Sequence, residues 1–435
     1  MSRRPRVVVV GAGFGGLEVV RRLAKVDCDV LLLDRRNHHL FQPLLYQVAT
    51  AALSPADIAE PVRAIVRKQN NVQVLLQEVT SVSLEERTLC VGAEDVVYDW
   101  LVLAAGATTA YFGNDEWVQR APGLKTIDDA IEIRRRVLMA FEEAELEEDE
   151  GARRAKLTFV VIGGGPTGVE MAGALREIAA MAIPEDFRRV DTKTARVYLL
   201  EGGPRLLPTM SEEASRRALE QLQGLGVDVR LDTMVTEVDD GVVWVGEESV
   251  AAANVVWAAG VEASALTRSL GVELDGQGRV RVQPDCSLPG HPRVFAVGDI
   301  AAQVDAVTKE PVPGVAQGAI QMGTFVGDII AGEISSAVPP ARPAFRYRNK
   351  GEMATIGRAR AVADIGGRTF SGLFAWLLWS AVHVAFLVGF RNKLLVMVHW
   401  AWQWLIQSRG ARLITGSSTP TVADPVDLGA GGSGP

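Results

Sequence analysis

Residues 7–16 read VVVVGAGFGG, and this stretch decides the fold. The run of valines predicts a buried parallel strand, the glycines predict a tight turn, and a helical pattern follows over Leu17–Val26. A second apolar run, Val30–Leu33, ends in Asp34. A strand, a glycine turn, a helix, a strand and an acid in this order are typical of the start of a doubly wound sheet that binds a dinucleotide.

The same order recurs in the middle of the chain. Phe159–Ile162 leads into GGGPTG at 163–168, a helix is expected to about Ala182, and Val197–Leu200 ends in Glu201. One such motif arises by chance in glycine-rich chains, whereas two copies in complete strand–turn–helix–strand contexts are strong evidence. We therefore predict an α/β fold with two Rossmann-like dinucleotide-binding domains.

Two later strands also resemble one another. Trp100–Ala104 leads into Ala105 and Gly106, and Val255–Ala258 leads into a turn that contains Gly260. Each follows its own glycine motif, which indicates an internal duplication.

The glycines and acids have separate expected roles. Gly11 permits the turn, Gly13 lets backbone amides approach a pyrophosphate, and Gly16 allows close helix–strand packing. Asp34 and Glu201 would each accept hydrogen bonds from a ribose diol, and a carboxylate at that place repels the 2′-phosphate of NADP. The second unit should therefore prefer NADH, although Arg205, four residues beyond Glu201, leaves NADP open.

A third element is Val294–Asp299, an apolar strand that ends in Gly-Asp. By itself Asp299 would ordinarily be a helix N-cap. In this position its carboxylate could also meet a polyol.

Charge and composition narrow the classes of function. The chain has 435 residues and a formal charge of −8, so nothing points to a nucleic-acid partner. Its three cysteines lie far apart and its five histidines show no ligand spacing, so we predict neither a disulfide framework nor a metal site. The N-terminal apolar run is too short for a signal peptide, which predicts a cytoplasmic origin.

The charge is unevenly distributed along the chain. No acid occurs from Ile365 to Ala423, where five bases and five of the nine tryptophans fall, so this stretch carries +5 and the remainder −13. Within it, 370–390 has no charge and would be long enough as a helix to span a membrane. Leu394–Ile406 is too short to span, and a polar stripe of His399, Gln403 and Gln407 suits a helix lying in a membrane surface.

Alternatives stay open for several segments. The apolar C-terminal helices could instead form a buried pair or a homodimer interface, and the same surface could serve both a dimer and lipid. Asp128–Arg154 is expected to be one charged helix, either a solvated face or a docking surface. The stretch 416–435 is rich in Gly, Ser and Pro and is expected to be disordered.

These motifs resemble those of two-dinucleotide-binding-domain flavoproteins and, more closely, those of the type II (non-proton-pumping) NADH:quinone oxidoreductases. The closer resemblance rests on four segments of the chain, namely 41–50 (FQPLLYQVAT), 163–172, 316–321 (AQGAIQ) and 350–357 (KGEMATIG). It implies FAD on the first domain, NADH on the second, and hydride transfer to FAD followed by two-electron reduction of a quinone of the menaquinone or ubiquinone type.

The resemblance also implies where the molecule works. A monotopic anchor would place the protein peripherally on the cytoplasmic face of the cell membrane, in contact with lipids through its C-terminal region. The implied domains are a discontinuous FAD domain (1–125 and 285–345), an NADH domain (155–284) and a C-terminal helical membrane-anchoring region (346–415).

The resemblance finally implies a set of site residues. Glu170 would lie at the junction of nicotinamide and flavin, as a proton relay or a positioning group, and Gln317 and Gln321 would flank the quinone head group. The residues expected to bind the cofactors are Gly11, Ala12, Gly13, Phe14, Gly15, Gly16, Asp34, Arg35, Ala105, Gly106, Asp299, Ala316, Gln317, Lys350, Gly163, Gly165, Gly168, Glu201 and Gly260.

Two other functions remain as alternatives at this point. One is a soluble NADH-dependent reductase of the ferredoxin or rubredoxin type, which predicts no lipid-seeking tail. The other is a non-catalytic NADH-sensing flavoprotein whose tail binds a protein.

Overall fold

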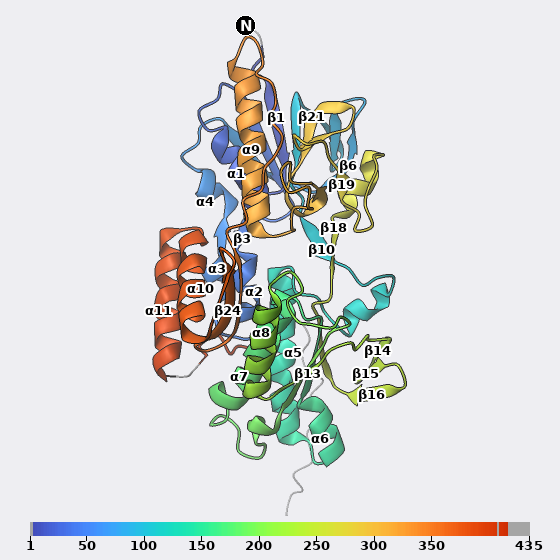
Figure 1. Cartoon of the computed structure of the whole chain (residues 1–435), viewed down its shortest axis with the longest axis vertical. Helices are drawn as coiled ribbons and strands as arrows, with labels where there is room; N and C mark the ends of the chain where they lie inside the picture. Colours follow the sequence, from blue (N-terminus) through green and yellow to red (C-terminus); the bar gives the residue numbers. More distant parts are fainter. Residues whose placement is uncertain (1–2, 407–408, 416–435) are drawn as a thin grey trace, which may run out of the picture.

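The structure is a computed structural model that describes residues 3–406 and 409–415. The expected disordered tail, 416–435, and Gln407 of the expected polar stripe lie outside the described residues. Figure 1 shows an elongated molecule in which two α/β units lie one above the other. The helices α10 (Gly372–Phe386) and α11 (Phe390–Ile406) lie side by side at one margin, level with the junction of the two units.

The upper unit is built on a six-stranded sheet. One of its two central strands, β1 (Arg6–Val10), pairs in parallel with β2 (Asp29–Asp34) and with β9 (Trp100–Leu103). The strand order is β20 (Ser287–Leu288), β21 (His291–Ala296), β9 (Trp100–Leu103), β1 (Arg6–Val10), β2 (Asp29–Asp34) and β5 (Val72–Leu76). The strand β21 therefore returns to this sheet from late in the chain.

Two helices of the upper unit pack closely because glycines line their contact. A Cβ added to Gly323 of α9 (Ala316–Ser335) would lie 2.3 Å from the carbonyl oxygen of Gly15 on α1 (Phe14–Arg22). This crossing holds the start of α9 beside the first glycine turn.

The lower unit repeats the same plan with four parallel strands. The order is β13 (Val227–Arg230), β12 (Arg196–Leu200), β11 (Thr158–Ile162) and β17 (Asn254–Trp257). The helices α7 (Pro166–Glu177) and α8 (Glu212–Leu225) contact this sheet and each other, and α5 (Ile127–Leu146) contacts β17. The predicted strand–turn–helix–strand units are thus both confirmed.

The duplication extends beyond these strands. An antiparallel three-stranded sheet precedes β9, formed by β6 (Val79–Ser83), β7 (Thr88–Val91) and β8 (Glu94–Val97). Its counterpart before β17 consists of β14 (Glu237–Asp239), β15 (Val242–Val245) and β16 (Glu248–Ala251). The strands β10 (Ala107–Thr109) and β18 (Val261–Ala263) follow the two Ala-Gly turns and pair with each other, which joins the units.

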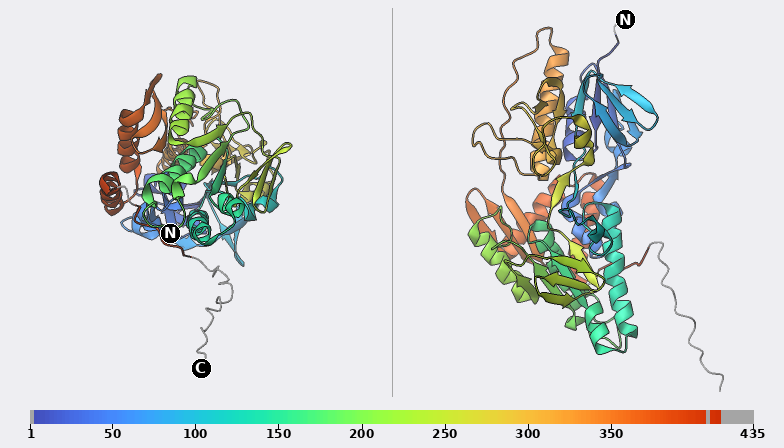
Figure 2. Two further views of the ribbon diagram at one scale, coloured as in Figure 1. Left: turned by 90° about the horizontal axis from the view of Figure 1, so that it is seen from below. Right: turned by 90° about the vertical axis from the view of Figure 1, so that its right-hand side faces the viewer.

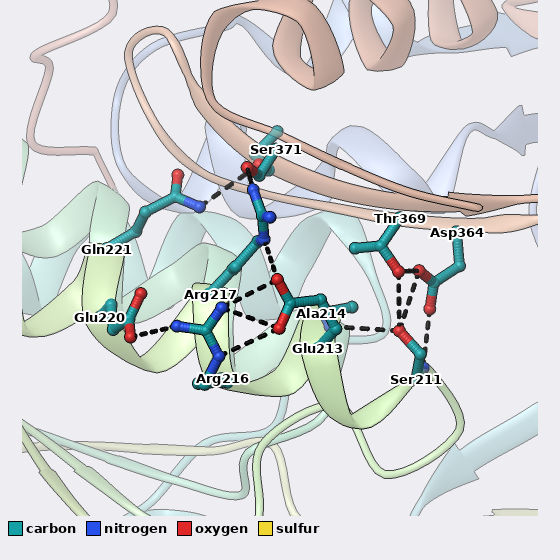
Figure 3. Close-up of polar contacts among 11 residues, drawn as sticks. Ser211, Glu213, Ala214, Arg216, Arg217, Glu220, Gln221, Asp364, Thr369 and Ser371 are labelled. Atoms are coloured by element: carbon teal, nitrogen blue, oxygen red, sulfur yellow. Dashed lines mark hydrogen bonds and ion pairs between the residues drawn. The ribbon is translucent and has the colours of Figure 1, made fainter.

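A separate sheet near the C-terminus packs against α10. It is antiparallel and contains β23 (Glu352–Gly357), β24 (Arg360–Ile365) and β25 (Arg368–Ser371). Figure 3 shows how α8 binds this sheet: Ser211 donates to Asp364 at 3.0 Å, and Arg217 donates to Ser371 at 2.5 Å. The helix α10 packs on β24, and α11 contacts both α10 and the short helix α3 (Pro55–Ile58) of the upper unit; Figure 2 shows the two helices from below.

The remaining short elements connect these parts. They are β3 (His38–Leu40), α2 (Leu45–Ala49), α3 (Pro55–Ile58), β4 (Ala59–Pro61), α4 (Val62–Val66), β19 (Val280–Arg281) and β22 (Ala301–Ala302).

Two expected helices differ from the structure. The single helix over Asp128–Arg154 is wrong: α5 ends at Leu146, and α6 (Glu150–Lys156) begins anew. The break arises because the Asp149 side chain accepts a hydrogen bond from the Ala152 amide and caps α6. The uncharged stretch 370–390 is also not one helix, since its first two residues end β25 and α10 stops at Phe386.

Candidate active site

One large cavity runs between the two units and has a volume of about 1550 Å³. This volume exceeds the range of roughly 300–1,000 Å³ that is usual for one small ligand, so it suits two dinucleotides. Nearly all the predicted site residues line it: Gly11, Ala12, Gly13, Phe14, Gly15, Asp34, Arg35, Ala105, Gly106, Gly163, Gly165, Glu170, Glu201, Gly260, Asp299, Ala316, Gln317, Gln321 and Lys350.

Gly16 and Gly168 are not among the lining residues. A Cβ on Gly16 would lie 1.8 Å from the carbonyl oxygen of Gly11, and a Cβ on Gly168 would lie 1.8 Å from that of Gly163. These two glycines therefore act through helix–turn packing rather than through contact with a ligand.

The first glycine turn forms a cradle at the carboxyl end of β1. Gly11 has φ +104°, and a Cβ there would lie 2.3 Å from the carbonyl oxygen of Ala104. A Cβ on Gly13, by contrast, would meet nothing within 4 Å, so the backbone at Gly13 is open to the cavity. The Asp34 carboxylate is held at the rim because it accepts hydrogen bonds from the amides of Ala12 (2.6 Å) and Arg36 (2.7 Å). This arrangement fits the adenosine diphosphate half of FAD.

The start of α9 forms the other wall of the FAD site. Asp299 follows β21 and lies in the cavity beside Gly314. The N-cap of α9, Val315, has no side-chain hydrogen bond to the first turn of the helix. The helix therefore presents free amides and its positive dipole end to the cavity near Ala316. These groups fit the polar parts of a flavin.

The second glycine turn is built like the first. Gly163 has φ +108°. Both carboxylate oxygens of Glu201 accept backbone amides, from Gly164 at 2.5 Å and from Gly203 at 2.7 Å. Arg205, which left NADP open, donates instead to the carbonyl oxygens of Pro208 and Met210. Its guanidinium is thus turned to the protein backbone, and Glu201 remains the charge at the nucleotide rim.

The two glutamines have partners that the sequence did not indicate. Gln317 donates to the carbonyl oxygen of Gly351 at 3.1 Å and accepts from the Lys350 amide at 3.1 Å. Gln321 pairs in the same way with both backbone groups of Arg348, at 3.0 and 2.9 Å. As predicted, both lie on one face of α9, and they fasten the segment 348–351 to it.

Glu170 lies on α7 with 8 % of its surface exposed. Burial raises the pKa of its carboxyl to about 8, and the hydrogen bond from the Thr355 amide at 3.3 Å opposes this rise. The group is therefore mainly protonated at neutral pH. It has the form of a neutral hydrogen-bond donor in the wall of the cavity.

A second, smaller cavity of about 120 Å³ adjoins the first, and sequence analysis did not anticipate it. Three tryptophans of α10 and α11 (Trp376, Trp379 and Trp400) and the buried Arg409 line it. Tyr46 lies within the motif at 41–50, which predicts no role for it, and it lines both cavities.

His383 of α10 also reaches the large cavity. Its Nδ1 is 2.7 Å from the carbonyl oxygen of Trp379, and burial lowers its pKa to about 4. A neutral ring whose Nδ1–H donates to a carbonyl leaves Nε2 as an acceptor. The sole sequence signal was a histidine within an apolar helix, which ordinarily indicates packing.

The fold and the two glycine turns, at 11–16 and 163–168, which open on one cavity, define a class of two-domain flavoproteins. The profile of the pyridine nucleotide-disulphide oxidoreductases matches residues 5–323, and that of the NDH2 C-terminal domain matches residues 349–409. No cysteine is among the residues that line the large cavity in the described part of the chain.

Relatives narrow the class further. The chain is 47% identical to the type II NADH:quinone oxidoreductase Ndh of Mycobacterium tuberculosis over 95% of this chain and 91% of the relative, and 44% identical to NdhA of the same organism over 95% and 90%. The chain belongs to the type II NADH:quinone oxidoreductases. A structure of NDH2 from Plasmodium falciparum in complex with NADH shares the fold, with a TM-score of 0.86, 21% identity, and coverage of 94% of this chain and 99% of that one.

Nucleotide choice is the first testable consequence of this geometry. Replacing Glu201 by Gln removes the negative charge beside the second glycine turn. It also removes one of the two side-chain oxygens that accept hydrogen bonds from backbone amides. We expect KM for NADH to rise about tenfold and discrimination against NADPH to narrow. Steady-state kinetics with both nucleotides measures this. Arg205→Lys is the matched control and should leave the NADH-to-NADPH ratio unchanged, because Arg205 binds backbone carbonyls; a selective loss of NADPH use would contradict that assignment.

The buried carboxyl of Glu170 predicts a pH dependence of stability. The folded chain keeps this proton up to about pH 8, whereas the unfolded chain releases it near 4.5, so the folded state loses stability as pH rises between these values. Glu170→Gln is neutral throughout and escapes this loss, which is at most on the order of 5 kcal/mol.

We expect the Tm of Glu170→Gln to rise relative to the parent between about pH 5 and about pH 9. The exposed variant Glu247→Gln controls for the loss of one charge. A Tm difference that stays constant with pH would show that Glu170 is ionised in the folded protein.

Proposed function

We propose that this chain oxidises NADH and reduces a quinone at the junction of its two dinucleotide cradles, without moving protons across a membrane. The balanced reaction is NADH plus one proton plus quinone, giving NAD⁺ and quinol. When bound, FAD accepts a hydride from NADH and returns two electrons to the quinone. The observation that carries the proposal is one continuous cavity lined by both glycine turns, by Asp299 and by Glu170.

The chain's own residues supply orientation and exclude water. Asp34 and the first turn would hold FAD, and Glu201 and the second turn would hold NADH, so that the reactive ends meet near Glu170. The protonated carboxyl of Glu170 is suited to hold or donate a proton there. Val382, His383 and Phe386 of α10 line the same cavity and would shield it from solvent.

Gln317 and Gln321 act in this proposal mainly by fixing the segment 348–351 against α9. Lys350, at the end of that segment, lines the cavity, and its Nζ lies 5.8 Å from the centre of the Phe386 ring. Fixing the segment would therefore hold Lys350 in the wall of the cavity that FAD would occupy.

The two alternative functions receive less support. A soluble ferredoxin-type reductase or a protein-binding sensor does not account for the match of residues 349–409 to the NDH2 C-terminal domain. We also propose the expected domain division, 1–125 with 285–345, 155–284 and 346–415, because β20 and β21 return to the first sheet.

Kinetics with purified, FAD-loaded protein tests the function. NADH should bleach the flavin absorbance, and a short-chain quinone should restore it, with steady turnover of both substrates. In sealed vesicles this turnover should produce no proton gradient. Flavin that NADH reduces but quinone never reoxidises would contradict the proposal.

We further propose that α10 and α11 dock peripherally on the lipid of the cytoplasmic face. Both helices expose large apolar side chains, whereas an unpartnered water-facing helix is usually polar. The exposed ones are Leu373, Phe374, Leu377, Phe386, Leu394, Met397, Val398 and Trp402. Among residues 3–406 and 409–415, no helix has the length and apolar character needed to cross a membrane.

The polar side of α11 supports the same orientation. His399 lies 3.4 Å from Asp57 of α3, and the buried Asn392 donates to the carbonyl oxygen of Ala59 at 3.2 Å. These two polar side chains face the protein, and the exposed apolar side chains of the helix remain available for lipid. A homodimer contact through part of that apolar side is compatible with lipid docking through the rest, since an exposed apolar surface suits both.

Charged substitutions test the docking surface. Leu377→Glu with Val398→Glu should weaken co-sedimentation with vesicles that contain anionic lipid by at least about tenfold, because carboxylates oppose insertion into the headgroup region. Leu146→Glu with Val338→Glu, at exposed apolar positions elsewhere, is the matched control. Unchanged vesicle binding would contradict lipid docking, and loss of self-association without lipid would assign the surface to a homodimer.

A further inference from the structure

A quinone carbonyl that enters the cavity needs a hydrogen-bond donor, and one N–H of each of the two glutamines is already engaged. The amide nitrogens of Gln317 and Gln321 both donate to backbone carbonyl oxygens, at 3.1 and 3.0 Å. A buried carbonyl that gains negative charge during reduction is costly unless a donor meets it.

Tyr46 lies where such a donor would act. It sits on α2 with 6 % of its surface exposed. Among the described residues, Tyr46 and Glu170 are the two that line both the large cavity and the tryptophan-lined one. The phenol therefore forms part of the partition between the cofactor cradle and the cavity beneath α10 and α11.

The direction of the hydrogen bonds at Tyr46 is fixed by chemistry. The indole nitrogen of Trp400 can only donate, and it lies 2.8 Å from Oε1 of Gln47. The amide nitrogen of Gln47 therefore faces the other way, and it donates to the Tyr46 oxygen at 2.8 Å. In this row of hydrogen bonds from Trp400 through Gln47, the oxygen of Tyr46 is therefore the acceptor. Its hydroxyl proton remains available for another partner.

That proton has no acceptor among the described residues. Burial raises the pKa of Tyr46 well above 10, and the nearby Glu170 adds to the rise, so the phenol is neutral under ordinary conditions. A chain of donors that points one way also polarises its last member and makes it a better donor.

We propose that the Tyr46 hydroxyl donates a hydrogen bond to a carbonyl oxygen of the quinone, and that Gln47 and Trp400 hold it in this orientation. The inference rests on the proposed function. Tyr46 keeps its proton: NADH supplies two electrons and one proton to the quinone, and solvent supplies the second proton. The donor chain ends on α11, so the helix that faces the lipid also orients the group that meets the quinone.

Tyr46→Phe tests the assignment on FAD-loaded protein. Stopped-flow absorbance should show flavin reduction by NADH within about twofold of the parent. Reoxidation by a short-chain quinone should be slower by about ten- to a hundredfold, because a donor to a developing negative charge is lost. Reoxidation by ferricyanide, which has no carbonyl, should be unchanged.

A spectroscopic readout separates contact from a general defect. Infrared difference spectra of an isotope-labelled quinone bound to the parent should show a carbonyl stretch shifted to lower frequency. The shift should be lost in Tyr46→Phe. Tyr98→Phe is the matched control, since that buried hydroxyl has no hydrogen-bond partner and lies outside both cavities.

Trp400→Phe provides a second, milder variant. Without the indole N–H, the Gln47 amide is free to turn and to accept the Tyr46 proton, so quinone reoxidation should fall severalfold with flavin reduction intact. This variant decides the question if Tyr46→Phe fails to retain FAD.

Three results would overturn the inference. They are quinone reoxidation at the parent rate in both variants, equal losses in flavin reduction and reoxidation, or an unshifted carbonyl band in the parent. In the last case the Tyr46 hydroxyl does not contact the quinone, and its role would be limited to the surroundings of Glu170. Absence of quinone turnover in the parent itself would refute the proposed function rather than the role of Tyr46.

Discussion

Neither Gly11 nor Gly163 can carry a side chain, and the rest of the site depends on this constraint. At each position φ lies near +105°, and a Cβ would fall within 2.6 Å of the strand that follows in the sheet, at Ala104 and at Ala258. Such contacts leave no room for even one methyl group. They allow each helix to start directly over the end of its strand, where its free amides face a phosphate. Because β10 and β18 pair, the two cradles open toward one cavity.

The sequence patterns predicted those features of the fold that depend on neighbouring residues alone. The strands around each glycine turn, the acids at Asp34 and Glu201 and the common face of Gln317 and Gln321 all follow from short-range periodicity. The partners of those glutamines come from residues about thirty positions later, and no local pattern contains them. The break between α5 and α6 was missed for a different reason. The glutamates there have adequate helix propensity, which predicts a continuous helix. The Asp149 side chain, however, forms a more favourable hydrogen bond as the N-cap of α6 than it could form inside a helix.

Arg409 shows why net charge along the sequence does not locate charge in space. By sequence it belongs to the basic C-terminal stretch for which lipid contact is expected. In the structure it is 9 % exposed and donates to Thr50 of the first unit and Ala174 of the second, with Glu177 at 3.5 Å. A buried guanidinium is tolerated only with such partners, so the chain after α11 is tied back to both units. The apolar helix pair is therefore held at both of its ends.

The partners of Arg409 and Arg412 reduce the positive charge that the proposed docking surface can offer to lipid headgroups. Arg412 pairs with Asp186, so Arg409 and Arg412 face the protein, and Lys393 donates to the carbonyl oxygen of Ala385 at 2.7 Å. The exposed bases of the stretch are therefore Arg368 and Arg391. Each base near an anionic surface contributes about 1 kcal/mol, and salt screens that attraction. The exposed apolar side chains of α10 and α11 are more numerous than these bases, and their burial contributes about 25 cal/mol per Å², which salt does not screen. In the proposed docking, lipid contact should thus depend mainly on apolar insertion. The inner sides of these helices carry Trp379, Trp400 and His383, which line the cavities. Apolar insertion would act along the whole length of both helices and so press these side chains against the site. Attraction to headgroups would act only where the bases lie.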